Sequence, residues 1–483
     1  MKQLHLMRPA LAAFIAALIS ACAVGPDYRA PQPAPARIVN AQAAQFTGAP
    51  PEAAWWHEFG DPELDGLVTR ALSANLDLAA AAARVHAARA VLVENRFDLA
   101  PHVPLSAAYS KANQQQPGFG TARIPVESES LGFDMQWELD LFGHVRRSVE
   151  AARAQLGAEQ AEQRGAQVSV AAEVARNYFE LRGTQTRLDV ARRNLLSESQ
   201  TEELTRVRYE GGRVTELDVE RARARLKATE ASIPPLEGQE KQAMYRLAVL
   251  LGLRPGALDA ELAPAPIRAF ATALPVGDTA ALLQQRPDVW AAERRLAAAS
   301  ARVGVATADL FPRVTVSGFV GFLTGNVGHL FSTGGADDAR AWAVTPAVSW
   351  AGLDYGSVHA RLRGRRAELD AASAAYSQTV LLALEETENS FVGYAKEQAA
   401  LASLTEQARA SAHASEIAEL QYRAGVTDFL TLLDAQRTQL EAEDAMVQSQ
   451  TQVNVRAVAI YKALGGLSQS DAAAPLAAAA LKP

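Results

Sequence analysis

The chain repeats itself at an offset of 211 to 213 residues, and this duplication limits its fold more than any other feature. Three motifs occur twice: Asp98-Leu99-Ala100-Pro101 returns as Asp309-Leu310-Phe311-Pro312, Trp137–Gly143 returns as Trp350–Gly356, and Tyr209–Leu217 returns as Tyr422–Phe429. Because the offset is nearly constant, the two halves are one duplicated unit in a single register. The fold must therefore contain the same arrangement of elements twice.

The first residues have the layout of a secretory signal followed by a lipid attachment site. Lys2 and Arg8 precede the apolar run Leu11–Leu18, which is too short to span a bilayer. Cys22 is the only cysteine among 483 residues, and it follows small residues as a bacterial lipobox cysteine does. We predict a signal peptide over 1–21 and lipid on Cys22. A buried structural thiol is the alternative, but a cysteine so near the terminus has no core to enter.

Charge and hydropathy argue against nucleic-acid binding and against a membrane-spanning helix. The formal net charge of -7 provides no basic surface for nucleic acid. No run of 18 apolar residues follows Cys22, so a membrane-spanning helix is not expected in the mature chain. If that chain crosses a bilayer, it must do so with strands.

Four segments alternate between apolar and polar residues with the period of a strand, clearly so over Leu131–Asp140 and Trp342–Trp350. We predict strands at about 102–111, 130–140, 313–323 and 341–351, each near the roughly ten residues of a tilted membrane strand. A soluble sandwich with one wet face is the alternative. The apolar faces, however, carry Trp137, Trp342, Trp350 and Tyr109, which an aromatic girdle would explain. Four strands cannot close a barrel, whereas three chains with four strands each would supply 12.

Most of the remaining sequence predicts long helix. Residues 144–209 and 358–422 contain no proline, and either stretch would form a helix roughly 100 Å long. Shorter helices are expected near 64–98 and 214–251, with a break at Pro234-Pro235. Arg286-Pro287-Asp288 is expected to open the corresponding helix of the second repeat. Glycine in Glu210-Gly211-Gly212 and in Arg423-Ala424-Gly425 predicts two hairpin turns, and both hairpins are expected at the end remote from the strands.

Together these residues resemble the TolC family of outer-membrane factors, in particular its lipid-anchored branch that serves RND-type efflux pumps. The motifs that carry the resemblance are Cys22–Tyr28, Trp137–Arg147, Arg286–Val289 and Tyr422–Gln436. The resemblance implies a mainly helical homotrimer with four strands per protomer in a 12-stranded transmembrane barrel and a long periplasmic helical barrel. It further implies an outer-membrane location, to which the non-acidic Ala23 would direct the lipoprotein. A periplasmic adaptor protein and an inner-membrane RND-type transporter would be its partners, with outer-membrane lipid around the barrel.

Domain boundaries follow from the repeat and the resemblance. We expect a signal peptide over 1–21, a lipid-anchored segment over 22–62, a first repeat over 63–255, a linker over 256–281, a second repeat over 282–466 and a disordered tail over 467–483.

The resemblance also implies a periplasmic gate at the tip of the second hairpin. Leu430 and Asp434 match the apolar and acidic rings that narrow the tunnel, and one helical turn places them on the same side. Three carboxylates around a three-fold axis would repel one another and attract cations. Arg437 and Asp428 are candidate members of the polar ties that hold the gate closed. The candidate adaptor contacts are Gly211, Gly212, Thr215, Gly425, Val426 and Thr427.

Other functions fit the sequence less well. The motifs of metalloproteases, serine hydrolases and P-loop proteins are missing, and the eight histidines are scattered, so no enzymatic activity, cofactor or metal is expected. A lipid-anchored coiled-coil scaffold would leave the amphipathic strands unexplained. A duct for a metal-cation pump or for type I secretion is the nearest alternative within the channel class.

Overall fold

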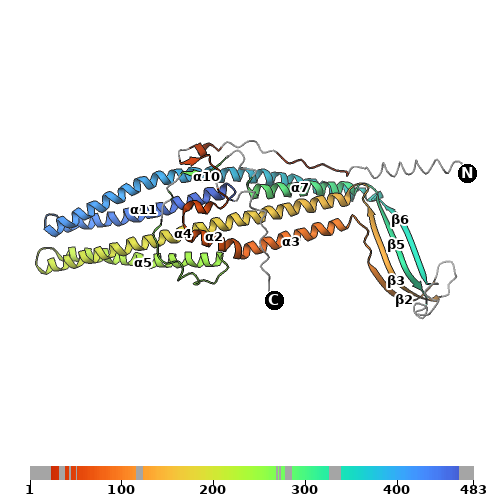
Figure 1. The fold of residues 1–483 in the computed structure, drawn as a ribbon, viewed down its shortest axis with the longest axis horizontal. Coiled ribbons are helices and arrows are strands. Elements are labelled where there is room, and N and C mark those ends of the chain that lie inside the picture. Colours follow the sequence, from red (N-terminus) through yellow and green to blue (C-terminus); the bar gives the residue numbers. More distant parts are fainter. Residues whose placement is uncertain are drawn as a thin grey trace. The chain divides into compact units, whose positions relative to one another are not determined.

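The computed structural model describes residues 23–31, 38–42, 45–50, 52–115, 123–267, 270, 273–277, 285–325 and 339–466 (Figure 1). Cys22, the predicted signal peptide and the predicted tail lie outside the described residues. The chain divides into two compact units. Unit 1 comprises Met1–Gln32, Arg84–Gln160 and Ala291–Ser377, and unit 2 comprises Pro33–Ala83, Ala161–Trp290 and Gln378–Pro483. Each unit therefore draws on both halves of the duplicated sequence.

Unit 1 contains an antiparallel sheet of four strands in the order β2-β3-β5-β6 (Figure 1). The strands are β2 (Leu105–Gln115), β3 (Arg123–Leu139), β5 (Arg313–Thr324) and β6 (Arg340–Ser349). The predicted starts at 102 and 130 are wrong. His102 forms only an isolated bridge with Gln136. The polar, proline-containing residues that precede 130 pair with β2 all the same, and Lys111 meets Glu127 across the strands at 3.3 Å.

The two faces of this sheet differ in polarity as the alternation predicts. Cross-strand register places Phe133, Val320 and Trp342 side by side on one face. These side chains are between 50% and 80% exposed in the chain. The other face carries Asp134, Gln136, Glu138 and several hydroxyl side chains. The sheet thus exposes an apolar face that nothing in the described chain covers.

The same helix-to-strand junction is built in both repeats. The indole N–H of Trp137 donates to the carbonyl of Leu99 at 3.2 Å, and that of Trp350 donates to the carbonyl of Leu310 at 3.0 Å. These four residues are counterparts at the offsets read from the sequence. The duplication is therefore one of three-dimensional structure as well as of sequence.

Long helices dominate the fold: α4 (His144–Glu210), α5 (Glu216–Leu250), α10 (Tyr355–Ala424) and α11 (Phe429–Ala463). The absence of proline over 144–209 and 358–422 predicted α4 and α10 correctly. The break expected at Pro234-Pro235 is wrong, because α5 continues through both residues. Two consecutive prolines remove two backbone hydrogen bonds, yet α5 runs without interruption from Glu216 to Leu250.

The shorter helices include α2 (Pro62–Ala74), α3 (Leu76–Phe97) and α7 (Pro287–Ala308), of which α3 and α7 lead into the two junctions. The single helix expected near 64–98 is divided at the buried Asn75. Its side-chain oxygen accepts from the N–H groups of Asp77 and Leu78, and its amide donates to the carbonyl of Leu250 at 2.9 Å. Asn75 thus ends α2 and caps α3, which the hydrophobic period alone could not reveal.

The main core lies in unit 2, where short elements close over the long helices. These elements are η1 (Val39–Gln42), η2 (Trp55–Phe59) and a parallel pair of β1 (Phe46–Thr47) and β4 (Leu274–Pro275). Trp55 stacks on Tyr461 with ring centroids 5.1 Å apart. In unit 1 the short η3 (Gly352–Asp354) precedes α10. None of the helices in the described ranges is long and apolar enough to cross a membrane.

Candidate gate at the ends of the helical hairpins

Both helical hairpins of unit 2 turn at glycine. Gly212 and Gly425 have φ of +69° and +75°, a left-handed conformation in which glycine carries no Cβ penalty. After these turns the N–H of Arg213 donates to the carbonyl of Arg208 at 2.8 Å, and that of Val426 to the carbonyl of Gln421 at 2.9 Å. These bonds satisfy the last carbonyls of α4 and α10. The turns lie where the sequence predicted them.

The candidate adaptor contacts lie on these two turns. Gly211, Gly212, Thr215, Gly425 and Val426 are exposed, and Thr427 is half-buried. The carboxylate of Asp218 accepts from the N–H of Thr215 at 3.0 Å and from its hydroxyl at 2.8 Å, which fixes the start of α5. Val426 is 77% exposed. Both turns are thus exposed, and the second also presents the apolar side chain of Val426.

The candidate gate residues lie along the first turns of α11. Leu430 is 53% exposed, and Asp434 lies one turn further along the same side of the helix. The carboxylate of Asp434 pairs with Arg437 at 2.8 Å, and Arg437 also approaches Glu441 at 4.0 Å. Leu430 and Asp434 thus form an open face in the single chain. Both ionic partners of Arg437 belong to α11 itself.

Asp428 has a local role at the start of α11. Its carboxylate accepts from the N–H of Thr431 at 2.9 Å and from the Thr431 hydroxyl at 2.7 Å. These hydrogen bonds, that of the hydroxyl first, lower the pKa of the Asp428 carboxyl. In the single chain Asp428 is an N-cap, and these contacts to Thr431 lie within α11 itself.

A small cluster near the turns joins all four long helices of unit 2. Tyr422 of α10 packs with Ala222 of α5 and with Phe429 and Leu432 of α11, and Leu204 of α4 adjoins them. Tyr422 is 1% exposed and Leu432 is fully buried. This packing attaches the second hairpin to the first through buried apolar side chains.

Polar contacts reinforce the same attachment. The guanidinium of Arg208 lies 4.3 Å from the ring centroid of Tyr422 and donates to the carbonyl of Arg423 at 2.9 Å. The Tyr422 hydroxyl lies 3.3 Å from that of the buried Thr205. A cation over an aromatic face is stabilising when it is shielded from water. Arg208 therefore holds both the ring and the backbone of α10.

Further contacts tie α11 to α4. The amide of Gln436 donates to the Thr201 hydroxyl at 2.9 Å, and Nε and Nη2 of Arg187 donate to the carboxylate of Asp444 at 2.6 and 3.1 Å. We call the residues of this attachment the hairpin lock: Arg187, Thr201, Thr205, Arg208, Tyr422, Phe429, Leu432, Gln436 and Asp444. Sequence reasoning predicted none of these contacts, although Tyr422 stood in a repeated motif. Within the described residues no cluster of His, Cys, Asp and Glu could hold a metal ion.

A duplicated chain with long hairpins tied near their turns, and with a sheet that exposes an apolar face, has the parts of a membrane channel. A family model described as outer membrane efflux protein matches residues 67–253 and 280–466. The chain therefore belongs to the outer membrane efflux protein family, and it is an efflux channel component rather than an enzyme.

The chain is similar to known outer-membrane proteins along nearly its whole length. Nodulation protein T of Rhizobium leguminosarum bv. trifolii is 30% identical, over 88% of this chain and 90% of that protein. The antibiotic efflux pump outer membrane protein ArpC of Pseudomonas putida is 32% identical, over 95% of each. The solved structure of the outer-membrane channel OprN is 47% identical and superimposes with a TM-score of 0.88, covering 92% of this chain and 99% of that one.

Proposed function

We propose that this protein is the outer-membrane exit duct of a tripartite efflux pump for drugs or similar small molecules. Three copies would form the closed barrel of 12 strands and a periplasmic tunnel of helices. A periplasmic adaptor would join this duct to an RND-type transporter of the inner membrane. The similarity to an antibiotic efflux pump outer membrane protein over 95% of the chain supports this class of cargo.

The sheet of unit 1 carries the proposal. Its apolar face includes Trp342, which is 80% exposed, and Val348, which is 69% exposed. Its edge strands β2 and β6 each have one strand neighbour in the described chain. Open edges are a liability in water and are not tolerated in lipid, where backbone groups must be paired. Lipid against the apolar face and neighbouring copies at both edges would satisfy these requirements.

The N-terminal segment supports a lipid anchor beside this sheet. The N–H of Val24 donates to the carbonyl of Phe142 at 3.1 Å, just after β3 ends. Arg147 donates to the carbonyl of Val24 at 3.3 Å and pairs with Asp27 at 2.7 Å. These bonds fix the residues that follow Cys22 against the strand-to-helix junction. Lipid on Cys22 would thus enter the same membrane as the sheet.

The hairpins supply the gate in this proposal. Leu430 and Asp434 of three copies would form the apolar and acidic rings, with Arg437 and Asp428 modulating them. The exposed turns at Gly211, Gly212 and Thr215 and at Gly425, Val426 and Thr427 would receive the adaptor. The hairpin lock would hold each second hairpin in the closed position.

The mass of the detergent-extracted protein tests the assembly. Native mass spectrometry of protein purified from outer membranes should give a trimer that carries lipid on each chain. The same preparation should form cation-selective channels in planar bilayers, because carboxylates line the constriction. A monomer that is extracted without detergent would overturn the proposal.

Asp434→Ala should raise single-channel conductance in planar bilayers. The variant removes three carboxylates from the proposed constriction and leaves Arg437 without this partner, so the ring becomes wider and less negative. Cation selectivity should fall in the same experiment. Glu406→Ala is the matched control, because Glu406 is an exposed carboxylate of α10 that also pairs with an arginine three residues away. Equal conductance in both variants would mean that Asp434 does not restrict the channel.

A further inference from the structure

We propose that the helices of unit 1 carry a binding site for organic anions, made by three arginines of the second repeat beside a group of apolar side chains. The arginines are Arg302 of α7 and Arg361 and Arg365 of α10. The ligand is a small molecule with an apolar body and one carboxylate or sulfonate group. The inference rests on the proposed duct in one respect, because the molecules that pass through the duct are those that would meet this site.

A hollow of about 410 Å³ lies among four helices of unit 1, α3, α4, α7 and α10. Its lining residues recur at three- and four-residue spacing along each helix, so each helix turns one face toward the hollow. Hollows of this size that are mostly apolar and have a few converging polar groups are typical of small-molecule sites. Five of the lining side chains are apolar: Val91, Ala151, Ala152, Val305 and Ala306.

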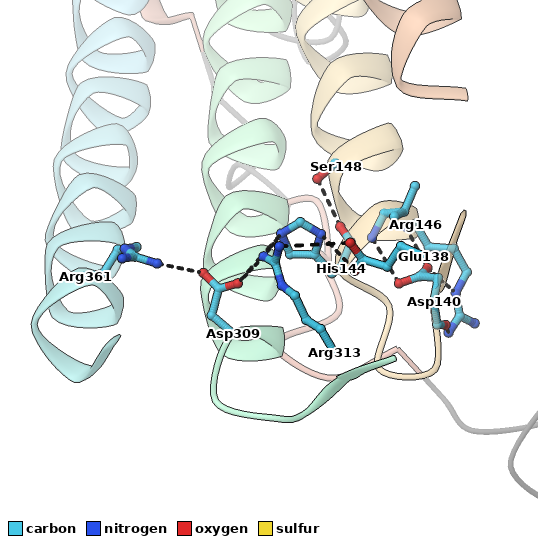
Figure 2. A network of polar contacts seen from close by, with 9 residues as sticks. Glu138, Asp140, His144, Arg146, Ser148, Asp309, Arg313 and Arg361 are labelled. Carbon is cyan, nitrogen blue, oxygen red and sulfur yellow. Dashed lines mark hydrogen bonds and ion pairs between the residues drawn. The ribbon is translucent and has the colours of Figure 1, made fainter. Parts of the chain in front are cut away.

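The charged groups that line the hollow are mostly positive. They are the three arginines, Arg302, Arg361 and Arg365, and one carboxylate, that of Asp309. Figure 2 shows Asp309 between Arg361, at 3.3 Å, and Arg313, at 2.6 Å. Two arginines thus share the one negative charge of Asp309. The hollow therefore keeps an excess of positive charge.

The other contacts of the three arginines leave them available to a ligand. Arg365 pairs with Glu368 at 2.8 Å, but Glu368 is 57% exposed and lies outside the lining of the hollow. No ion pair is found for Arg302 within the part of the chain that the structure describes. Arg361 and Arg365 stand four residues apart on α10, a spacing at which like charges repel. An anion in the hollow would relieve this repulsion and give Arg302 a partner.

The duplication indicates that the fold does not require these arginines. At the offsets of 211 and 213 residues, the counterparts of Arg302, Arg361 and Arg365 are uncharged: Val91, Ser148 and Ala152. All three counterparts line the same hollow. The helices α3 and α7 are each 22 residues long, although only α7 has an arginine at the shared position. The positive charge is therefore an addition of the second repeat and not a condition for forming the helices.

An adjoining hollow has a different character. It measures about 500 Å³, shares Ser148 with the first hollow and is lined in part by β3 and β5. Its ionisable lining residues are Asp98, His102, Glu138 and His144, and no arginine or lysine is found among the described residues that line it. His144 lies 3.5 Å from Glu138 (Figure 2). The carboxylates disfavour an anion in this second hollow, which restricts the anion to the arginines.

The chemistry of the hollow defines the class of ligand. A guanidinium holds its N–H donors in one plane and can donate two parallel hydrogen bonds to a carboxylate or a sulfonate. The apolar side chains of α4 and α7 would contact the body of the same molecule. A neutral molecule of equal shape would gain only the apolar contact, and an inorganic anion would gain only the charge. Both should bind more weakly than an organic anion.

Naphthalene-2-sulfonate is the probe for this site, because its charge does not change with pH in the range in which the protein is folded. Isothermal titration calorimetry measures its binding to the full-length protein in nanodiscs of zwitterionic lipid, with empty nanodiscs as the blank. The neutral naphthalene-2-sulfonamide and inorganic sulfate should each bind at least about tenfold more weakly, the loss expected for one charged hydrogen bond or for the apolar contact. Equal affinity for either compound would overturn the assigned class of ligand.

The double variant Arg302→Gln/Arg365→Gln should weaken the binding of the sulfonate by about tenfold or more and leave that of the sulfonamide unchanged. Glutamine keeps polar groups at both positions, and circular dichroism should show the same helix content as in the wild type. Arg366→Gln is the matched control, because Arg366 is an exposed arginine next to Arg365 that does not line the hollow. Equal weakening by Arg366→Gln would mean that surface charge in general, and not this hollow, attracts the anion.

The proposed duct and the anion site can fail separately. Protein that forms channels in planar bilayers but binds the sulfonate no better than the sulfonamide would overturn the site and leave the duct. Protein that binds the sulfonate through Arg302 and Arg365 but forms no channel would support the site and overturn the duct.

Discussion

Tyr422→Ala should release the second hairpin from the first and leave the channel open for a much larger share of the time. The ring of Tyr422 is 1% exposed and lies among residues of α5, α10 and α11. Truncating a buried aromatic residue to alanine costs about 3–5 kcal/mol. The packing against Ala222 and Leu204 and the contact with Arg208 belong to the attachment between hairpins, so this part of the cost should fall on the closed state. A shift of about 3 kcal/mol would change an open-to-closed ratio by more than a hundredfold.

The conductance and open probability of single channels in planar bilayers measure this effect. Tyr422→Phe is the matched control, since it keeps the ring under Arg208 and removes only the hydroxyl that lies 3.3 Å from Thr205. It should behave almost as the wild type. A second control is Tyr209→Ala, because Tyr209 is the counterpart of Tyr422 in the first repeat and is 43% exposed. Equal open probabilities for Tyr422→Ala and Tyr209→Ala would mean that Tyr422 does not hold the channel closed.

The architecture could be predicted from the sequence because local rules agree with the repeat. Proline-free stretches gave α4 and α10, and period-two alternation gave the strands. The errors concern the bounds of helices and strands, which depend on the hydrogen bonds of a few individual residues. Asn75 divides the helix expected near 64–98 by capping α3, and α5 tolerates Pro234-Pro235. Polar residues before Ser130 lengthen β3 because backbone pairing with β2 does not require apolar side chains.

The contacts of the gate could not be predicted in the same way. Arg208 and Tyr422 lie in different hairpins, and neither their types nor their spacing marks them as partners. Only the packing of unit 2 brings them together. The repeat even misleads here, because Tyr209 and Tyr422 occupy the same place in the motif while one is exposed and the other is buried. The duplication predicts which helices and strands are present, whereas tertiary packing determines which of their faces are buried.

The roles of Asp434 and Asp428 at the gate could be predicted from the resemblance but cannot be seen in a single chain. The resemblance placed both at the gate, and the chain shows their contacts within α11, to Arg437 and Thr431. A ring around a three-fold axis is made by three copies, so one chain presents only the open face of such a ring. The gate role of these residues therefore remains a prediction that conductance must decide.

Arg286→Met should lower the stability of unit 2, by less than the roughly 3–5 kcal/mol that an unpaired buried charge costs, because the carboxylates left behind, Asp288 and Glu386, are 48% and 42% exposed. Arg286 is 6% exposed. Its guanidinium pairs with Asp288 at 2.8 Å and with Glu386 at 2.6 Å, and it donates to the carbonyl of Ala463 at 2.8 Å. One side chain thus joins the start of α7 to α10 and to the end of α11. Methionine fills similar volume but satisfies none of these groups.

The loss of stability should depend on pH in a defined direction. Burial acts to raise the pKa of Asp288, but the hydrogen bond and charge of Arg286 outweigh it and hold that pKa below its ordinary value of 3.8. A lowered pKa stabilises the fold above the ordinary value, and this contribution is lost as pH falls through the folded-state pKa. The difference in stability between wild type and Arg286→Met should therefore be largest near neutral pH and should narrow below about pH 4.

Thermal unfolding in detergent, followed by circular dichroism, measures this difference. Arg302→Met is the control, because Arg302 is an exposed arginine of α7. A difference that stays constant from pH 7 to pH 3 would mean that Arg286 acts through packing rather than through its carboxylate partners.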